Sequence, residues 1–123
     1  MYRFQPGRIM RDGDLPVFDR ARRPVGFLAR ARGLLGTRSL EAGAALWFDR
    51  CSAIHMFGMR YAIDLVFLRA GKVVVLYPAV PPMRTRSFKG AEVALEMPLG
   101  SIERLRIEQD TALHFESSEA DRP

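Results

Sequence analysis

Three ionisable residues lie in an otherwise apolar stretch between Cys51 and Leu68. They are His55, Arg60 and Asp64, and their neighbours are methionine, phenylalanine and aliphatic residues. Burying a bare charge in apolar surroundings costs several kcal/mol, so such a group either finds a partner or shifts its pKa. We therefore expect any chemistry of this chain in or near this stretch.

Asp64 is the acid inside a predicted strand. Strand alternation places it on one face with Val66, and places Ile63 and Leu65 on the other. Both faces are apolar, so we expect Asp64 to be half buried. It could act as a general acid or base with a tuned pKa. The favoured interpretation is structural: a carboxylate that accepts backbone N–H bonds or pairs with Arg60.

His55 shares a predicted strand face with Phe57 and Met59. Cys51 lies roughly 13 Å away along a strand, too far for a Cys–His pair unless the chain bends. A lone histidine on such a face is more often a core or rim residue than a ligand. Two histidines and one cysteine at these spacings match no metal motif, so we predict no metal and no cofactor.

Glu96 is the last candidate. Alternation places it on a face with Ala94 and Glu92, so we expect it to point toward solvent. A carboxylate pair of Asp64 and Glu96 would permit acid–base catalysis, but only the distance between the two groups decides this.

The composition is that of a folded protein. The chain has 123 residues, of which 48% are hydrophobic and 27% are charged, which is typical of a globular protein. We expect a single domain over 1–123, with an N-terminal strand region over 1–18 and a frayed tail over 116–123. No apolar run reaches the ~18 residues that span a bilayer.

Positive charge is concentrated at the start of the chain. Residues 1–40 hold nine Arg and three Asp, a net of +6, although the whole chain carries only +5. One interpretation is a polyanion-binding face; the favoured one is a solvated basic face. The arginines concerned are Arg20, Arg22, Arg23, Arg30 and Arg32.

The N-terminus and the cysteine count bear on location. The first residues contain no apolar segment typical of a secretory signal, and a single cysteine forms no disulfide within the chain. We therefore expect a cytoplasmic protein.

The hydrophobic pattern predicts mostly short strands. A helix of roughly ten residues is expected from Pro24, closed by Gly33 or Gly36. A helical turn is expected over 101–105. Strands are expected within 1–18 and over 44–49, 52–59, 62–69, 72–77, 92–97 and 111–115. This pattern predicts a mainly β, mostly antiparallel fold, a sandwich or barrel, with one or two short helices.

The segment 78–90 is predicted to be a loop. It contains Pro78, Pro81 and Pro82, which remove backbone donors, so it cannot be an interior strand. We expect a mobile lid over the region of His55 and Asp64.

Four sequence boxes, read in order, resemble one bacterial family over about residues 31–115. They are 32–36 (Arg-Gly-Leu-Leu-Gly), 54–60 (Ile-His-Met-Phe-Gly-Met-Arg), 63–68 (Ile-Asp-Leu-Val-Phe-Leu) and 93–100 (Val-Ala-Leu-Glu-Met-Pro-Leu-Gly). The chain resembles the domain of unknown function 192 family. The resemblance implies a compact, mainly antiparallel β domain, roughly a two-sheet sandwich, and no defined reaction. Many relatives begin with an export signal, which is not seen here.

The favoured function is a binding or scaffolding module with a cleft. The predicted ligand-binding residues are His55, Met59, Arg60, Asp64 and Glu96. A cleft with few polar groups among apolar ones is the usual form of a small-ligand site. The first alternative is a hydrolase-type enzyme that uses Asp64 and His55, which requires the two side chains within hydrogen-bond reach. The second is a polyanion binder, which requires the N-terminal arginines to form one face.

Overall fold

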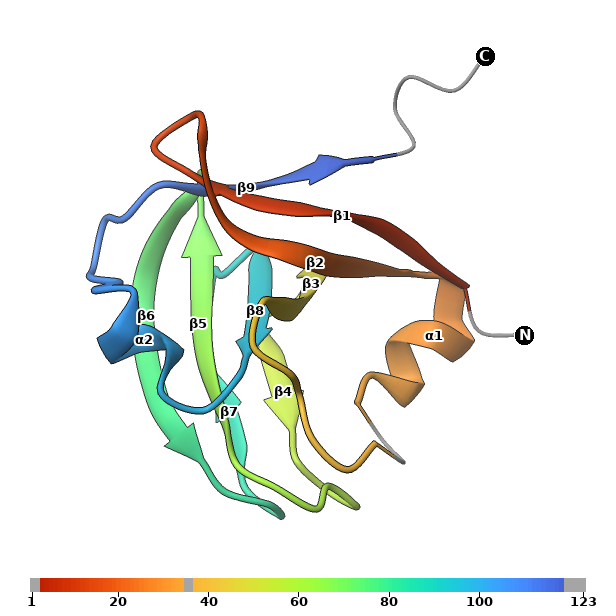
Figure 1. Cartoon of the computed structure of the whole chain (residues 1–123). Helices are drawn as coiled ribbons and strands as arrows, with labels where there is room; N and C mark the ends of the chain where they lie inside the picture. The colour runs from red at the N-terminus through yellow and green to blue at the C-terminus, as the bar shows by residue number, and fades with distance from the viewer. Residues whose placement is uncertain (1–2, 35–36, 119–123) are drawn as a thin grey trace.

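The computed structural model describes residues 3–34 and 37–118, and in this part of the chain it contains nine strands and two short helices (Figure 1). In chain order these are β1 (Arg3–Arg11), β2 (Leu15–Val25), α1 (Gly26–Arg32), β3 (Ala44–Asp49), β4 (Ala53–His55), β5 (Ile63–Arg69), β6 (Lys72–Val80), β7 (Thr85–Ser87), β8 (Val93–Met97), α2 (Ser101–Arg104) and β9 (Leu113–Ser117).

Seven strands form one curled sheet in the order β6-β5-β8-β3-β2-β1-β9, and β4 and β7 form a separate pair. Every neighbouring pair is antiparallel except β2–β3, which is parallel. The curl brings the two edges together, because Lys72 at the start of β6 bridges Ala112 just before β9 (Figure 1). The prediction of a mainly β, mostly antiparallel, barrel-like fold is confirmed. In place of two large sheets, one sheet forms a half-barrel.

The sheet buries side chains on both faces, so there are two core clusters. In β5, Val66 and Leu68 belong to the inner cluster with Phe18, whereas Leu65 and Phe67 belong to the outer one. Helix α2 packs on the inner cluster, and β4–β7 cover part of the outer face (Figure 1). Such double coverage explains why β5 is apolar at successive positions and does not alternate.

The N-terminal region differs from the prediction. Strand β2 continues through the arginine-rich segment to Val25, and α1 starts only at Gly26. Pro24 therefore lies in a strand opposite Phe4 and does not begin the helix. The pairing of β2 with β3 ends at Arg22, so Pro24 has one free side, where a missing N–H is tolerated.

Helix α1 ends at Gly33, one of the two glycines predicted to close it. The Gly33 N–H donates to the Ala29 carbonyl at 3.0 Å, and its φ of +50° lies in the left-handed region that favours glycine. The alternative, Gly36, lies outside the described residues. Neither helix in the described part is long and apolar enough to cross a bilayer.

Two predicted irregular segments are partly strand. Strand β6 runs on to Val80, and β7 lies within the segment 78–90 and pairs with β4, so the prediction of a continuous loop is wrong. Strand β9 extends to Ser117, opposite Gly7 of β1, so the predicted tail begins later than residue 116. Residues 119–123 lie outside the described part.

Candidate functional site

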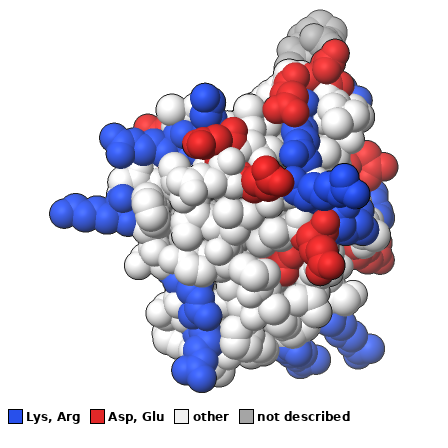
Figure 2. Space-filling view, turned by 90° about the vertical axis from the view of Figure 1, so that its left-hand side faces the viewer, with Lys and Arg blue, Asp and Glu red and all other residues white. Residues whose placement is uncertain are grey.

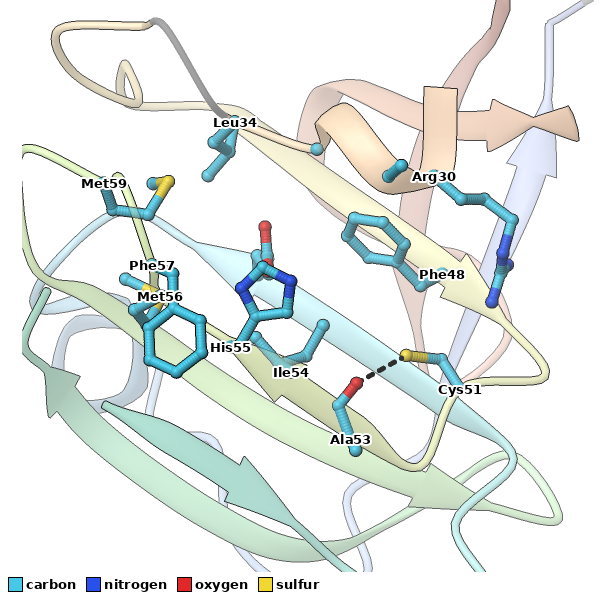
Figure 3. A pocket seen from close by; sticks show the side chains of 13 residues that line it. Arg30, Leu34, Phe48, Cys51, Ala53, Ile54, His55, Met56, Phe57 and Met59 are labelled. Atoms are coloured by element: carbon cyan, nitrogen blue, oxygen red, sulfur yellow. Dashed lines mark hydrogen bonds between the residues drawn. The ribbon is translucent and has the colours of Figure 1, made fainter. Parts of the chain in front are cut away.

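A cavity of about 310 Å³ opens on the outer face of the sheet, between the end of α1, the end of β3 and the segment around β4 (Figure 3). Its volume is at the lower end of the range for small-molecule sites. The polar residues that line it are Arg30, Cys51, His55 and Glu96; the larger apolar ones are Leu34, Phe48, Ile54, Met56, Phe57 and Met59.

Arg30 fixes one wall of the cavity. Its guanidinium donates to the backbone carbonyl of Asp49 at 2.6 Å and to that of Arg50 at 3.2 Å. These bonds tie α1 to the end of β3, where Arg50 has a positive φ and the chain turns away from the sheet. The donors of Arg30 thus serve the fold and hold the helix beside the opening.

Glu96 on β8 is the buried acid of the cavity. It shares the outer face with Ala94, and only 6% of the residue is exposed. It makes no hydrogen bond or ion pair with the described residues, and burial raises its pKa to about 8. The carboxyl group is therefore mostly protonated at neutral pH. The prediction that Glu96 points to solvent is wrong, because the chain around β4 covers this face.

Two further ionisable groups lie close enough to feel the charge of Glu96. Burial raises the pKa of the Cys51 thiol, which donates to the Ala53 carbonyl at 3.3 Å (Figure 3). Burial also raises the pKa of Tyr61, whose hydroxyl lies 2.7 Å from that of Thr37. In both cases a charged Glu96 would raise the pKa further. The surroundings therefore favour the neutral forms of Glu96, Cys51 and Tyr61.

Aromatic and sulfur-containing side chains form much of the remaining wall. The rings of His55 and Phe57 are stacked, with centroids 5.1 Å apart, and Phe48 lines the cavity from β3 (Figure 3). Met59 is half-buried and also lines it. Of the predicted ligand-binding set, the structure therefore brings together His55, Met59 and Glu96.

Asp64 belongs to a different part of the molecule. It is 1% exposed, and its two carboxylate oxygens accept the backbone N–H of Ala79 at 3.0 Å and of Ile102 at 2.8 Å. This confirms the structural interpretation, with backbone donors as the partners. Arg60 is exposed and does not line the cavity. The predicted cleft therefore does not include Arg60 or Asp64.

Several N-terminal arginines are paired with acids. Arg20 contacts Glu41 at 2.9 Å, and Arg23 contacts Asp49 at 3.3 Å. The side chain of Arg32 is outside the described residues. On the face that carries α2, basic and acidic groups also lie close together beside a broad uncharged area (Figure 2). The described arginines do not favour a continuous polyanion-binding face.

Some residues of the cavity were not predicted. Met56 and Phe57 both line the cavity, although alternation placed them on opposite faces, because β4 ends at His55 and not at residue 59 as predicted. No sequence signal indicates Arg30 as a wall residue, since its acceptors lie about twenty residues away. Among the described residues, no three His, Cys, Asp or Glu side chains are grouped so that they could hold a metal ion.

Comparison with known proteins identifies the family. The model of the family described as "DUF192: Uncharacterized ACR" matches residues 20–115. The chain belongs to this family, which confirms the resemblance found in the four sequence boxes. No curated protein matches the chain significantly.

Two solved structures share the fold. One is a protein of Sinorhizobium meliloti 1021 described as a candidate transcription regulator, with a TM-score of 0.73 and 17% identity over 93% of this chain and 95% of that one. The other is a protein of unknown function from Novosphingobium aromaticivorans DSM 12444, with a TM-score of 0.71 and 19% identity over 90% and 84% of the two chains. At these identities the likeness concerns the fold alone.

Proposed function

We propose that this protein is a small-molecule-binding module whose ligand occupies the cavity above Glu96. One observation carries the proposal: Glu96 is buried, lines the cavity and has no hydrogen-bond partner in the described chain. No side-chain N or O atom of the described residues is both fully buried and without a partner, so the oxygens of Glu96 can be reached from the cavity. A ligand in the cavity can therefore bond to Glu96, and an apolar cavity with few polar groups is the usual form of such a site.

Binding is better supported than hydrolysis. The hydrolase alternative needs Asp64 and His55 to act together, but both oxygens of Asp64 are engaged by backbone N–H groups and Asp64 does not line the cavity. His55 is an exposed rim residue stacked on Phe57. This arrangement lacks the contact between acid and base that the reaction requires.

Nucleic-acid binding is also less well supported. The candidate-regulator description belongs to a structural neighbour with 17% identity, and Arg20 and Arg23 have carboxylate partners in this chain. A phosphate backbone would have to displace those partners, which lowers the net gain from each contact.

The test uses three probes with one skeleton: phenethylamine, phenethyl alcohol and phenylacetate. They are titrated into the isotope-labelled protein while its amide resonances are followed. We expect at least one probe, at millimolar concentration, to shift the resonances of residues 51–59 and of Glu96. If none of the three shifts them, the proposal is wrong.

A matched pair of variants localises the binding. Ala31 lines the cavity and is exposed, so Ala31→Phe fills space without disturbing the core. Ala42 is also exposed but does not line the cavity, so Ala42→Phe is the control. Binding should be lost in the first variant and retained in the second. Equal binding by both would place the probe elsewhere.

A further inference from the structure

We propose that the ligand is an organic ammonium ion with a compact apolar body, which forms an ion pair with Glu96. This inference rests on the proposed function, because it assigns a chemical class to the molecule in the same cavity. It is carried by the combination of an acid without a counter-ion and a wall of aromatic and sulfur-containing side chains.

Glu96 has no cation of its own among the described residues. Arg30 is the basic residue that lines the same cavity, but its guanidinium is engaged by the carbonyls of Asp49 and Arg50. No ion pair joins Arg30 to Glu96. A positively charged ligand would supply the missing partner, and a charge-assisted hydrogen bond in a poorly solvated site is among the strongest that proteins make.

The walls suit a cation as well as the apolar part of the ligand. Phe48 and Phe57 line the cavity, and the faces of such rings attract ammonium groups. The sulfur atoms of Met56 and Met59, which also line it, are polarizable and adapt to irregular shapes. Aromatic walls are the feature by which proteins recognise alkylammonium groups, and here Glu96 lies beside them.

Other classes of ligand fit less well. An anion can accept only the single proton of a neutral Glu96, and it would be repelled by the ionised form in the same small cavity. A metal ion lacks ligands, since the described residues group no three suitable side chains. A neutral apolar molecule leaves the hydrogen-bonding capacity of Glu96 unused. An ammonium ion satisfies both the charge and the hydrogen bonds.

Pairing of an ammonium ion with Glu96 should release a proton, which can be measured. In the cavity without ligand, Glu96 is mostly protonated at neutral pH, because burial raises its pKa to about 8. An ammonium ion stabilises the carboxylate, so Glu96 releases its proton to the buffer as the ion pair forms. The other titratable or charged groups around it are Arg30 on α1, His55 on β4, and Cys51 and Tyr61 beside β4.

The first experiment compares the affinities of the three probes by calorimetry. We expect phenethylamine to bind about tenfold more tightly than phenethyl alcohol, the difference typical of a hydrogen bond to a charged group. Phenylacetate should bind weakest. Equal binding of amine and alcohol would overturn the ammonium inference and leave the proposed function standing. If phenylacetate binds most tightly, the ammonium inference is wrong and the proposed function still stands. If none of the three probes binds, both the ammonium inference and the proposed function are wrong.

The second experiment assigns the preference to Glu96. Glu96→Gln keeps the size of the side chain and removes its charge, so the preference for the amine should disappear while the alcohol still binds. Glu103→Gln is the control, because Glu103 is exposed on α2, the helix that packs on the inner cluster. A preference that persists in Glu96→Gln would overturn the role of Glu96.

A third measurement needs no variant and remains decisive if Glu96→Gln fails to fold. Calorimetry of the wild-type protein at neutral pH, in buffers of different ionisation enthalpy, counts the protons released. We expect the amine to release close to one proton and the alcohol none. Amine binding without proton release would overturn the ion pair with Glu96.

Discussion

Two carboxyl groups are buried in neighbouring strands of the same sheet. Asp64 on β5 is opposite Met97 of β8, one residue from Glu96. Asp64 faces the inner side of the sheet and accepts two backbone N–H bonds. Glu96 faces the outer side and has no partner in the described chain. Asp64 and Glu96 are buried to nearly the same extent. The difference between them therefore lies in the groups that surround each carboxyl group.

The comparison shows that burial alone does not identify a functional acid. A buried carboxyl group must be bonded or neutral. For Asp64 the chain supplies the donors, which makes the residue part of the fold. For Glu96 the chain supplies an opening, which makes the residue available to a ligand. Each prediction below tests one side of this difference.

The largest effect is expected from removing Asp64. Asp64→Ala leaves the N–H groups of Ala79 and Ile102, whose bonds to Asp64 are partly buried, without their acceptor, at a cost of roughly 1–3 kcal/mol for each donor that water does not reach. Asp64→Asn keeps one acceptor and should cost less. Unfolding in urea measures both. An unchanged midpoint for Asp64→Ala would show that these bonds contribute nothing to stability.

The second prediction concerns the pH dependence of stability. The pKa of Glu96 is about 8 in the folded chain, whereas its ordinary value, which applies to the unfolded chain, is 4.5. The folded protein therefore holds this proton more tightly, so stability is greatest below the unfolded pKa and is lost as pH rises toward 8. We expect Glu96 to remove roughly 3 kcal/mol between about pH 5 and pH 8.

Urea unfolding at several pH values across that window checks the prediction. Glu96→Gln does not titrate, so its stability should fall less than that of the wild-type protein over the same range. Asp64→Asn retains Glu96 and should retain the wild-type slope. Parallel curves for the wild-type protein and Glu96→Gln would contradict the assignment.

The third prediction concerns the cover over Glu96. The pair β4–β7 is held by backbone bonds such as Met56 N–H to the Arg84 carbonyl at 2.8 Å and Phe88 N–H to that of Ser52 at 3.0 Å. Isolated two-stranded pairs are only marginally stable. We expect these amides to exchange faster than that of Val66 in β5, but more slowly than that of exposed Leu99. Exchange of the Phe88 amide as slow as in β5 would end the prediction that the segment 78–90 is a mobile lid.

The smallest effect is expected at the charged surface. Because Arg20 and Arg23 are paired with carboxylates, we expect weak or no binding to heparin at low salt. A titration at two salt concentrations tests this. Strong binding that falls steeply with salt would show that counterions are released from a polyanion-binding face.

The sequence predicts the sheet well where the pattern is local. The apolar run from Ile63 to Leu68 indicated a strand buried on both faces, and the structure confirms it. Pro24 was misleading, because its preference for a helix start was overridden by the pairing of β2 with β1. The strand β7 has only three residues and follows three prolines, so its pairing with β4 leaves almost no local signal.

The site was only partly predictable for a related reason. For His55 the predicted strand 52–59 is too long, because β4 ends at His55, and Met56, predicted on the opposite face, lines the same cavity as Phe57 and Met59. For Glu96, alternation correctly gave a shared face with Ala94. It gives the direction of a side chain but not what covers that face. For Glu96 the cover comes from a segment some forty residues earlier in the chain, so its burial required the tertiary structure.

The parallel pairing of β2 with β3 has a consequence for how the cavity forms during folding. Arg20 lies opposite Ala44, and parallel neighbours require a crossover connection, which here includes α1 and Leu34. This same connection forms a wall of the cavity. The cavity can therefore close only after a long-range contact has formed, whereas the β1–β2 hairpin is local. Long-range pairing is slow, so the cavity would form late in folding. A ligand that binds there would stabilise the folded chain against loss of the β2–β3 pairing.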